Sequence, residues 1–195
     1  MKNLFIGTAA LALLAIPAAA SADSVEYWSN DWWYVADNTS REGGPACALA
    51  TEDVGIGDRA SLLSVLHYDG NSVFMFVQNK DWTITKDRKY ENIDITFFDA
   101  RGEISASFNG ADWTGTNRDT MGVNNDSSIL DYYAKSQNAT MFRVENNDDI
   151  TVIGRINLNG SAQAVSKLRE CFVRAKARYD TDVARERISP RNPFG

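Results

Sequence analysis

The chain has 195 residues, of which 44% are hydrophobic and 24% are charged, and its formal net charge at pH 7 is −6. This hydrophobic content excludes a wholly disordered protein. No nucleic-acid partner is expected. One histidine and two cysteines are a poor set for a zinc site, and no Gly-x-Ser-x-Gly motif is present. We therefore expect no metal, no cofactor and no recognisable catalytic residue.

Residues 1–22 have the layout of a secretory signal peptide. Lys2 gives a positive start, Leu4–Ile16 is uncharged and mostly apolar, and Ala20-Ser21-Ala22 offers small side chains for cleavage. The apolar run of 13 residues is shorter than the about 20 residues that a membrane-spanning helix needs, and no later run is long and apolar enough. The sequence therefore predicts a bacterial protein that is periplasmic or secreted, with no transmembrane segment once the signal is removed.

Residues 23–180 are predicted to form one globular domain, because domains of about 100–200 residues are common. Residues 181–195 are polar, contain two prolines and are predicted to be a loose tail. The domain holds two cysteines, Cys47 and Cys171. An exported protein with an even number of cysteines most simply pairs them. The sequence therefore predicts a disulfide that joins the start of the domain to its end.

Turn signals divide the first part of the domain into short strands. Asp69-Gly70-Asn71 is a strong hairpin signal, and glycine-rich or polar segments separate the other runs. Every residue of Val73–Val77 is apolar, which predicts a strand covered on both faces. The predicted strands are Trp32–Ala36, Ala46–Thr51, Ser61–Tyr68 and Ser72–Gln78.

Two further hairpins are predicted in the second part of the domain. Tyr90–Asp99 alternates between apolar and polar residues and turns at Arg101-Gly102 into a second alternating run that contains Ile104 and Phe108. Residues 109–125 are rich in glycine and asparagine and are predicted to be a loop. The third hairpin joins Ala139–Glu145 to Ile150–Leu158.

Helical patterns occur at two places. Asp126 or Ser127 can cap a helix at about 126–136, which would bury Ile129, Leu130 and Tyr133. Ser161 can cap a last helix at about 161–179, whose apolar stripe consists of Val165, Leu168, Cys171, Phe172 and Ala175. Sequential hairpins with one inserted helix and one final helix indicate an α+β, mainly β fold. We expect an antiparallel sheet in a sandwich- or barrel-like arrangement with both helices packed on it.

Both ends of the domain resemble small exported bacterial proteins of the invasion-associated locus B type. The residues that carry the resemblance are Trp33-Tyr34-Val35, Cys47, and the closing stretch from Leu158-Asn159-Gly160-Ser161 to Cys171. The middle of the chain is unmatched. The resemblance implies a β-rich periplasmic fold and an accessory or host-interaction role, and it supplies no catalytic residues.

Tryptophans next to aspartates are the candidate binding residues. Tryptophan suits a binding surface because it offers a flat apolar face and a polar edge. Trp113 lies between two glycines in the predicted 109–125 loop and is therefore expected to be exposed. Together with Asp112, Trp82 and Trp32 it forms the predicted binding set, whose partner would be a protein, an envelope component or a glycan.

Two alternative functions remain open from the sequence. A carboxylate-based hydrolase of envelope or extracellular glycans would need a close pair of carboxylates, chosen from Asp94, Asp99, Asp112 and Asp119. A binder of anionic lipid or lipopolysaccharide would use residues 167–191, which carry eight basic and four acidic side chains, whereas residues 23–166 carry 11 basic and 22 acidic ones. His67, the single histidine, is interpreted as an ordinary strand-end residue rather than a catalytic one.

Overall fold

The structure is a computed structural model that describes residues 24–51, 55–146 and 149–188. The predicted signal peptide, residues 1–22, lies outside the described residues. No helix in the described part of the chain is long and apolar enough to cross a membrane.

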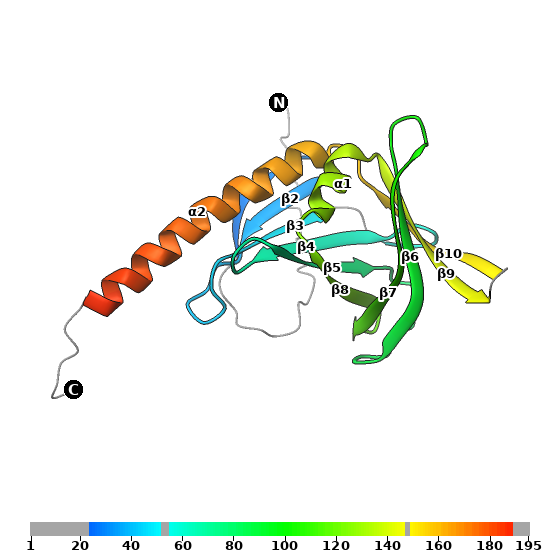
Figure 1. Ribbon diagram of the computed structural model, residues 1–195, viewed down its shortest axis with the longest axis horizontal. Coiled ribbons are helices and arrows are strands. Elements are labelled where there is room, and N and C mark those ends of the chain that lie inside the picture. Colours follow the sequence, from blue (N-terminus) through cyan, green and yellow to red (C-terminus); the bar gives the residue numbers. More distant parts are fainter. Residues whose placement is uncertain (1–23, 52–54, 147–148, 189–195) are drawn as a thin grey trace, which may run out of the picture.

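Ten strands form one antiparallel sheet in the order β1-β2-β3-β4-β5-β8-β7-β6-β9-β10 (Figure 1). The mainly β, α+β class that the sequential hairpins predict is confirmed. The strands are β1 (Val25–Ser29), β2 (Trp33–Asp37), β3 (Ala46–Thr51), β4 (Ser61–His67), β5 (Ser72–Gln78), β6 (Lys89–Phe98), β7 (Ile104–Asn117), β8 (Thr120–Asp126), β9 (Asn138–Asn146) and β10 (Asp149–Asn157).

The sheet curls until its last strand meets a segment from its first half. The backbone N–H of Arg155 in β10 donates to the carbonyl of Asp58 at 2.7 Å, and the N–H of Ala60 donates to the carbonyl of Arg155 at 2.8 Å. Residues 58–60 lie immediately before β4. The sheet is therefore one curled layer whose concave inner face forms the core, and not two separate sheets.

Two helices cover the inner face. They are α1 (Ile129–Lys135) and α2 (Ser161–Ile188). The disulfide between Cys47 in β3 and Cys171 in α2 is present, as predicted. The predicted apolar stripe of α2 is buried against β2 and β3, and the indole Nε1 of Trp33 donates to the carbonyl of Asn159 at 2.6 Å, which fixes the chain just before α2 begins.

The prediction of a loop at residues 109–125 is wrong. β7 continues to Asn117 and β8 begins at Thr120, so most of this segment is the β7–β8 hairpin. β8 pairs with β5 on one side and with β7 on the other. Hydrogen bonding on both sides of β8 outweighs the weak strand preference of its glycine and asparagine residues, because strand propensity depends strongly on the neighbours.

Three smaller differences concern element limits and burial. β1 was not predicted, and α2 continues to Ile188 instead of ending near Tyr179, so residues 181–188 are helical and not a loose tail. An ion pair between Lys176 and Asp180, four residues apart, supports the longer helix. The prediction that β5 is covered on both faces is also wrong, because Val73, Met75 and Val77 are buried whereas Phe74 is 40% exposed.

Candidate functional site

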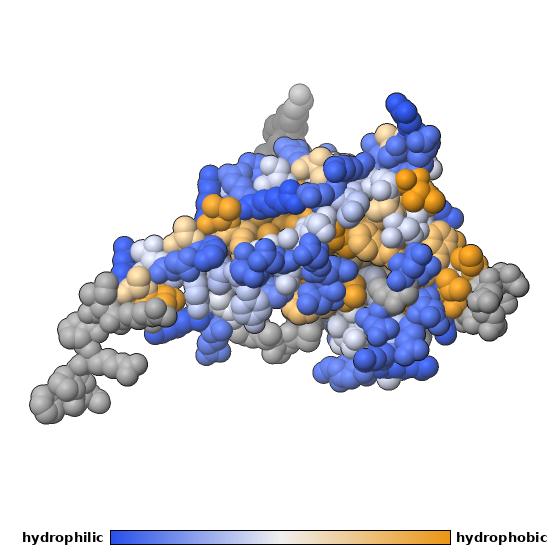
Figure 2. Space-filling model, in the orientation of Figure 1, coloured by the Kyte–Doolittle hydropathy of each residue, from blue (hydrophilic) through white to orange (hydrophobic). Residues whose placement is uncertain are grey.

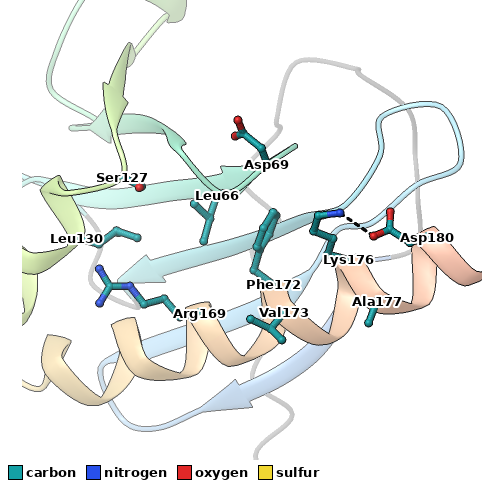
Figure 3. A pocket seen from close by; sticks show the side chains of 11 residues that line it. Leu66, Asp69, Ser127, Leu130, Arg169, Phe172, Val173, Lys176, Ala177 and Asp180 are labelled. Atoms are coloured by element: carbon teal, nitrogen blue, oxygen red, sulfur yellow. Dashed lines mark hydrogen bonds and ion pairs between the residues drawn. The ribbon is translucent and has the colours of Figure 1, made fainter.

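A cavity of about 530 Å³ opens between α2, the β4–β5 turn and the start of α1 (Figure 3). We call it the α2 groove. Its floor is apolar and comes from three elements: Leu66 of β4, Leu130 of α1 and Phe172 of α2. Val173 and Ala177 continue the apolar surface outward along α2. Charged residues form its rim, and they are Asp69, Arg169, Lys176 and Asp180.

Local sequence patterns place the floor residues. Leu66 belongs to the inward-facing set of β4, Leu130 is a buried residue of α1, and Phe172 belongs to the apolar stripe of α2. Gly70 in the β4–β5 turn has a φ of +84°, which glycine adopts easily. A Cβ at Gly70 would lie 2.9 Å from a ring carbon of Phe172. Glycine at this position therefore lets the turn lie directly against Phe172 and form the wall opposite α2.

The two cations of the rim already have carboxylate partners. Arg169 contacts Asp131 at 2.6 Å, and Lys176 contacts Asp180 at 2.6 Å. Figure 3 shows the second of these pairs at one end of the groove. An anionic ligand would therefore have to compete with a carboxylate that is already in place.

Asp69 is the rim charge without such a partner. Its carboxylate accepts hydrogen bonds from the backbone N–H of Asn71 at 2.9 Å and from Asn71 Nδ2 at 2.8 Å. These hydrogen bonds hold the pKa of Asp69 below its ordinary value, so it is anionic at neutral pH. Within the described part of the chain Asp69 forms no ion pair, and the groove therefore offers an uncompensated negative charge beside an apolar floor.

The basic character of α2 is largely cancelled by neighbouring carboxylates. Each lysine and arginine of α2 whose side chain the structure describes has an acidic partner within 4 Å; these pairs are Lys167–Glu170, Arg169–Asp131, Arg174–Glu170, Lys176–Asp180, Arg178–Asp37 and Arg185–Asp182. Figure 2 shows hydrophilic residues along this face beside a band of hydrophobic surface. The hypothesis of an anionic-surface binder gains no support from this arrangement.

The prediction that Trp113 is exposed is wrong. Trp113 is fully buried in the core, and its Nε1 has no hydrogen-bond partner. The residue lies in β7, whose inward-facing side chains pack inside the curled sheet. A buried indole offers no platform to a ligand.

The other predicted binding residues lie apart from the α2 groove. Trp82 is half-buried, and its Nε1 donates to the carbonyl of Ile153 at 3.1 Å. Trp32 is 55% exposed in the β1–β2 turn, and Asp112 is exposed on β7. None of these residues lines the α2 groove, and their role in binding stays a prediction.

The four carboxylates considered for a hydrolase are spread along the β6–β7 and β7–β8 hairpins, and none of them lines the α2 groove. Asp99 follows β6 and accepts hydrogen bonds from the backbone N–H groups of Arg101 and Glu103 at the β6–β7 turn. Asp119 lies in the β7–β8 turn, at the other end of β7. Asp94 and Asp112 lie within β6 and β7, between these two turns. The arrangement gives no support to a two-carboxylate site.

His67 occupies the end of β4, as predicted. The residue is 9% exposed, and its ring stacks on that of Phe74 with the ring centres 4.7 Å apart. Neither ring nitrogen has a hydrogen-bond partner, and burial lowers the pKa of His67. No group of three or more histidine, cysteine, aspartate or glutamate side chains in the described residues could hold a metal ion.

Sequence reasoning missed the α2 groove because its walls come from three distant segments. The buried positions of Leu130 and Phe172 were predicted, but the gap between α1, α2 and the β4–β5 turn was not. Comparisons with protein-family models, curated proteins and solved structures found no match to this chain. The resemblance to proteins of the invasion-associated locus B type therefore stays a prediction.

Proposed function

We propose that this chain is an exported, non-catalytic binding protein and that the α2 groove holds a cationic, amphipathic ligand. The single observation that carries the proposal is the combination of an apolar floor with an anionic rim residue, Asp69, that has no ion-pair partner among the described residues. A cavity of about 530 Å³ falls within the ordinary size range of ligand sites. The Cys47–Cys171 disulfide supports export, because disulfides persist in oxidising compartments.

The proposed ligand would place its apolar side on Leu66, Leu130 and Phe172 and its positive charge beside Asp69. A positive charge on the ligand is favoured for two reasons. The cations of the rim are already occupied by Asp131 and Asp180. In addition, residues 23–166 carry 22 acidic and 11 basic side chains, so the body of the protein attracts cations at long range.

The test uses a fluorescent amphipathic peptide of leucine and lysine as the probe and a peptide of leucine and glutamate as its anionic counterpart. We expect the lysine peptide to bind and the glutamate peptide to bind at least about tenfold more weakly, because like charges repel across a partly desolvated contact. Asp69→Asn removes the charge and retains a residue that turns favour, and it should weaken binding of the lysine peptide about two- to fivefold, the size of one exposed ion pair.

Asp112→Asn is the matched control, because Asp112 is an exposed carboxylate that lies outside the α2 groove. This control should bind the lysine peptide as the wild type does. Equal affinity of the wild type and of Asp69→Asn would contradict the proposed site, and preference for the glutamate peptide would contradict the proposed ligand class. A larger loss in Asp112→Asn would place the site at Asp112 and not in the α2 groove.

A further inference from the structure

The α2 helix is attached to the rest of the protein in two parts. Its first part, residues 161–168, is fixed near the start of the helix, where Ser161 Oγ donates to the carbonyl of Tyr133 at 2.6 Å and Leu168 is fully buried. Its second part, residues 169–180, supplies every α2 residue that lines the α2 groove. The contacts that hold the second part against the sheet therefore determine the width of the groove.

Few contacts hold the second part of α2. Its buried residues are Cys171, Phe172 and Ala175, and no described side chain further along α2 is buried. Arg178 pairs with Asp37 of β2, but the arginine side chain is 60% exposed, and ion pairs that water reaches contribute little. The disulfide from Cys171 to β3 is the one covalent attachment of this part. We therefore expect it to be the strongest.

The disulfide lies beside the floor of the α2 groove. Phe172 follows Cys171 directly in the chain, and its ring lies against Gly70 in the turn that carries Asp69. Fixing Cys171 to β3 therefore also fixes the distance between this wall of the groove and the β4–β5 turn. Without the covalent bond the second part of α2 is free to move away from the turn, and the apolar floor and Asp69 then no longer border one cavity.

We propose that the Cys47–Cys171 disulfide controls ligand binding in the α2 groove, so that the oxidised chain binds its cationic ligand and the dithiol chain binds it much more weakly. This inference rests on the proposed function, since it concerns the same groove. Oxidation forms one S–S bond in the chain and transfers two electrons and two protons to a disulfide-bonded oxidant, which becomes a dithiol. Because thiols stay reduced in the cytosol, a newly made chain acquires the binding-competent groove only after export.

The first test measures binding of the fluorescent lysine peptide to the chain without residues 1–22, before and after reduction with dithiothreitol. We expect the reduced chain to bind at least about tenfold more weakly, which lies within the usual range of coupling between two sites. Cys47→Ser with Cys171→Ser should bind as weakly as the reduced chain, with or without the reductant. Equal binding by the oxidised and reduced wild type would overturn the inference. A reduced chain that loses its strand signal in circular dichroism would overturn it as well, since only α2 should move.

Asn79→Ala is the matched control for a general loss of stability. Asn79 is fully buried and forms three hydrogen bonds outside the α2 groove, so its replacement should destabilise the fold without moving α2. The variant should keep the disulfide and bind the lysine peptide as the wild type does. If Asn79→Ala and the double cysteine variant lost binding equally, the loss would follow stability and not the position of α2, and the inference would be wrong.

A redox titration gives a readout that a disulfide with only a stabilising role would not change in a chain that stays folded. Linkage requires the ligand to favour the form that it binds more tightly. If the oxidised chain binds the lysine peptide tenfold more tightly, saturating peptide should lower the reduction potential of the disulfide by about 30 mV. The glutamate peptide at the same concentration should cause a smaller shift. A potential that saturating lysine peptide leaves unchanged would contradict the inference.

These measurements also separate the inference from the proposed function. An oxidised chain that binds the lysine peptide through Asp69, together with a reduced chain that binds it equally well, would overturn only the control by the disulfide. An oxidised chain that does not bind the lysine peptide would overturn the proposed function, and the inference with it.

Discussion

The two halves of the curled sheet are held together by different means. In the first half, α2 packs an apolar stripe on β2 and β3, and a disulfide between residues 124 positions apart fixes the helix to β3. In the second half, β10 returns to residues 58–60 through backbone hydrogen bonds, and a polar network holds this segment to the end of β5. Its centre is Asn79, which is fully buried.

The Asn79 network uses nearly every polar atom of one side chain. Asn79 Nδ2 donates to the carbonyls of Gly57 at 2.8 Å and Arg59 at 2.6 Å, and Oδ1 accepts the backbone N–H of Asp81 at 2.8 Å. Trp82 adds an apolar contact over Gly154 of β10. The comparison teaches that a covalent and apolar contact holds α2, one wall of the α2 groove, whereas directional hydrogen bonds hold the segment to which β10 returns.

The largest expected effect comes from the disulfide. Replacing both cysteines, Cys47→Ala with Cys171→Ala, should lower the free energy of unfolding by up to about 4–5 kcal/mol, because the crosslink restricts a very long loop in the unfolded chain. Urea unfolding of the variant and the wild type measures the loss. A loss below about 1 kcal/mol would mean that apolar packing alone holds α2 in place, since this is the size of a single ordinary contact.

Asn79→Ala should have the next largest effect. It removes three hydrogen bonds made by a fully buried side chain, and at about 1 kcal/mol each we expect their loss to cost about 3 kcal/mol. Asn124→Ala is the matched control, because Asn124 is an exposed asparagine in β8. If urea unfolding showed that both variants lose the same free energy of unfolding, the role given to Asn79 would be contradicted.

Combining the cysteine and Asn79 substitutions sharpens the comparison. If the two halves are stabilised independently, the losses should add within about 0.5 kcal/mol, as they do for distant sites without shared partners. A combined loss well below the sum would show that closure of the sheet and attachment of α2 depend on one another. The measurement is again the free energy of unfolding in urea.

The smallest expected effect is a pH dependence caused by His67. Burial lowers its pKa in the folded protein below the ordinary value of 6.5, so the unfolded chain binds the proton first as the pH falls. Stability is therefore lost as the pH falls through about 6.5. The carboxylates of Asp37, Asp69, Asp126 and Glu170 have lowered pKa values, so their contribution is lost only at more acidic pH.

The check compares the free energy of unfolding in urea at pH 7 and at pH 5, in the wild type and in His67→Phe. The variant should lose less stability between these two pH values, because phenylalanine does not titrate and can still stack on Phe74. An identical loss in both proteins would place the pH dependence elsewhere.

The sequence predicted the elements whose limits depend on neighbouring residues. Ala46–Thr51 and Ser72–Gln78 were predicted with the limits that the structure has, because turn signals on both sides mark them. The Cys47–Cys171 pair was also predicted, since two cysteines in one domain leave a single pairing within the chain. Residues 109–125 were mispredicted because β8 obtains its hydrogen bonds from β5, a strand more than 40 residues earlier.

The candidate site was the part least accessible to sequence reasoning. Exposed tryptophans were expected to bind, but burial of Trp113 depends on the path of β7 through the curled sheet. The apolar residues of the α2 groove look like ordinary core residues in the sequence, and Asp69 looks like an ordinary turn residue. Whether the apolar residues and Asp69 line one groove depends on the distance between α2 and the β4–β5 turn.

The sequence by itself determined the strand-rich fold class, the hairpins with clear turn signals, the apolar stripe of α2 and the cysteine pair. These follow from periodicity and turn chemistry, which act over a few residues, and from the cysteine count. Only the tertiary structure decided the curl of the sheet, the burial of Trp113 and the α2 groove. These depend on contacts between residues far apart in the chain, and such contacts form only where packing brings the segments together.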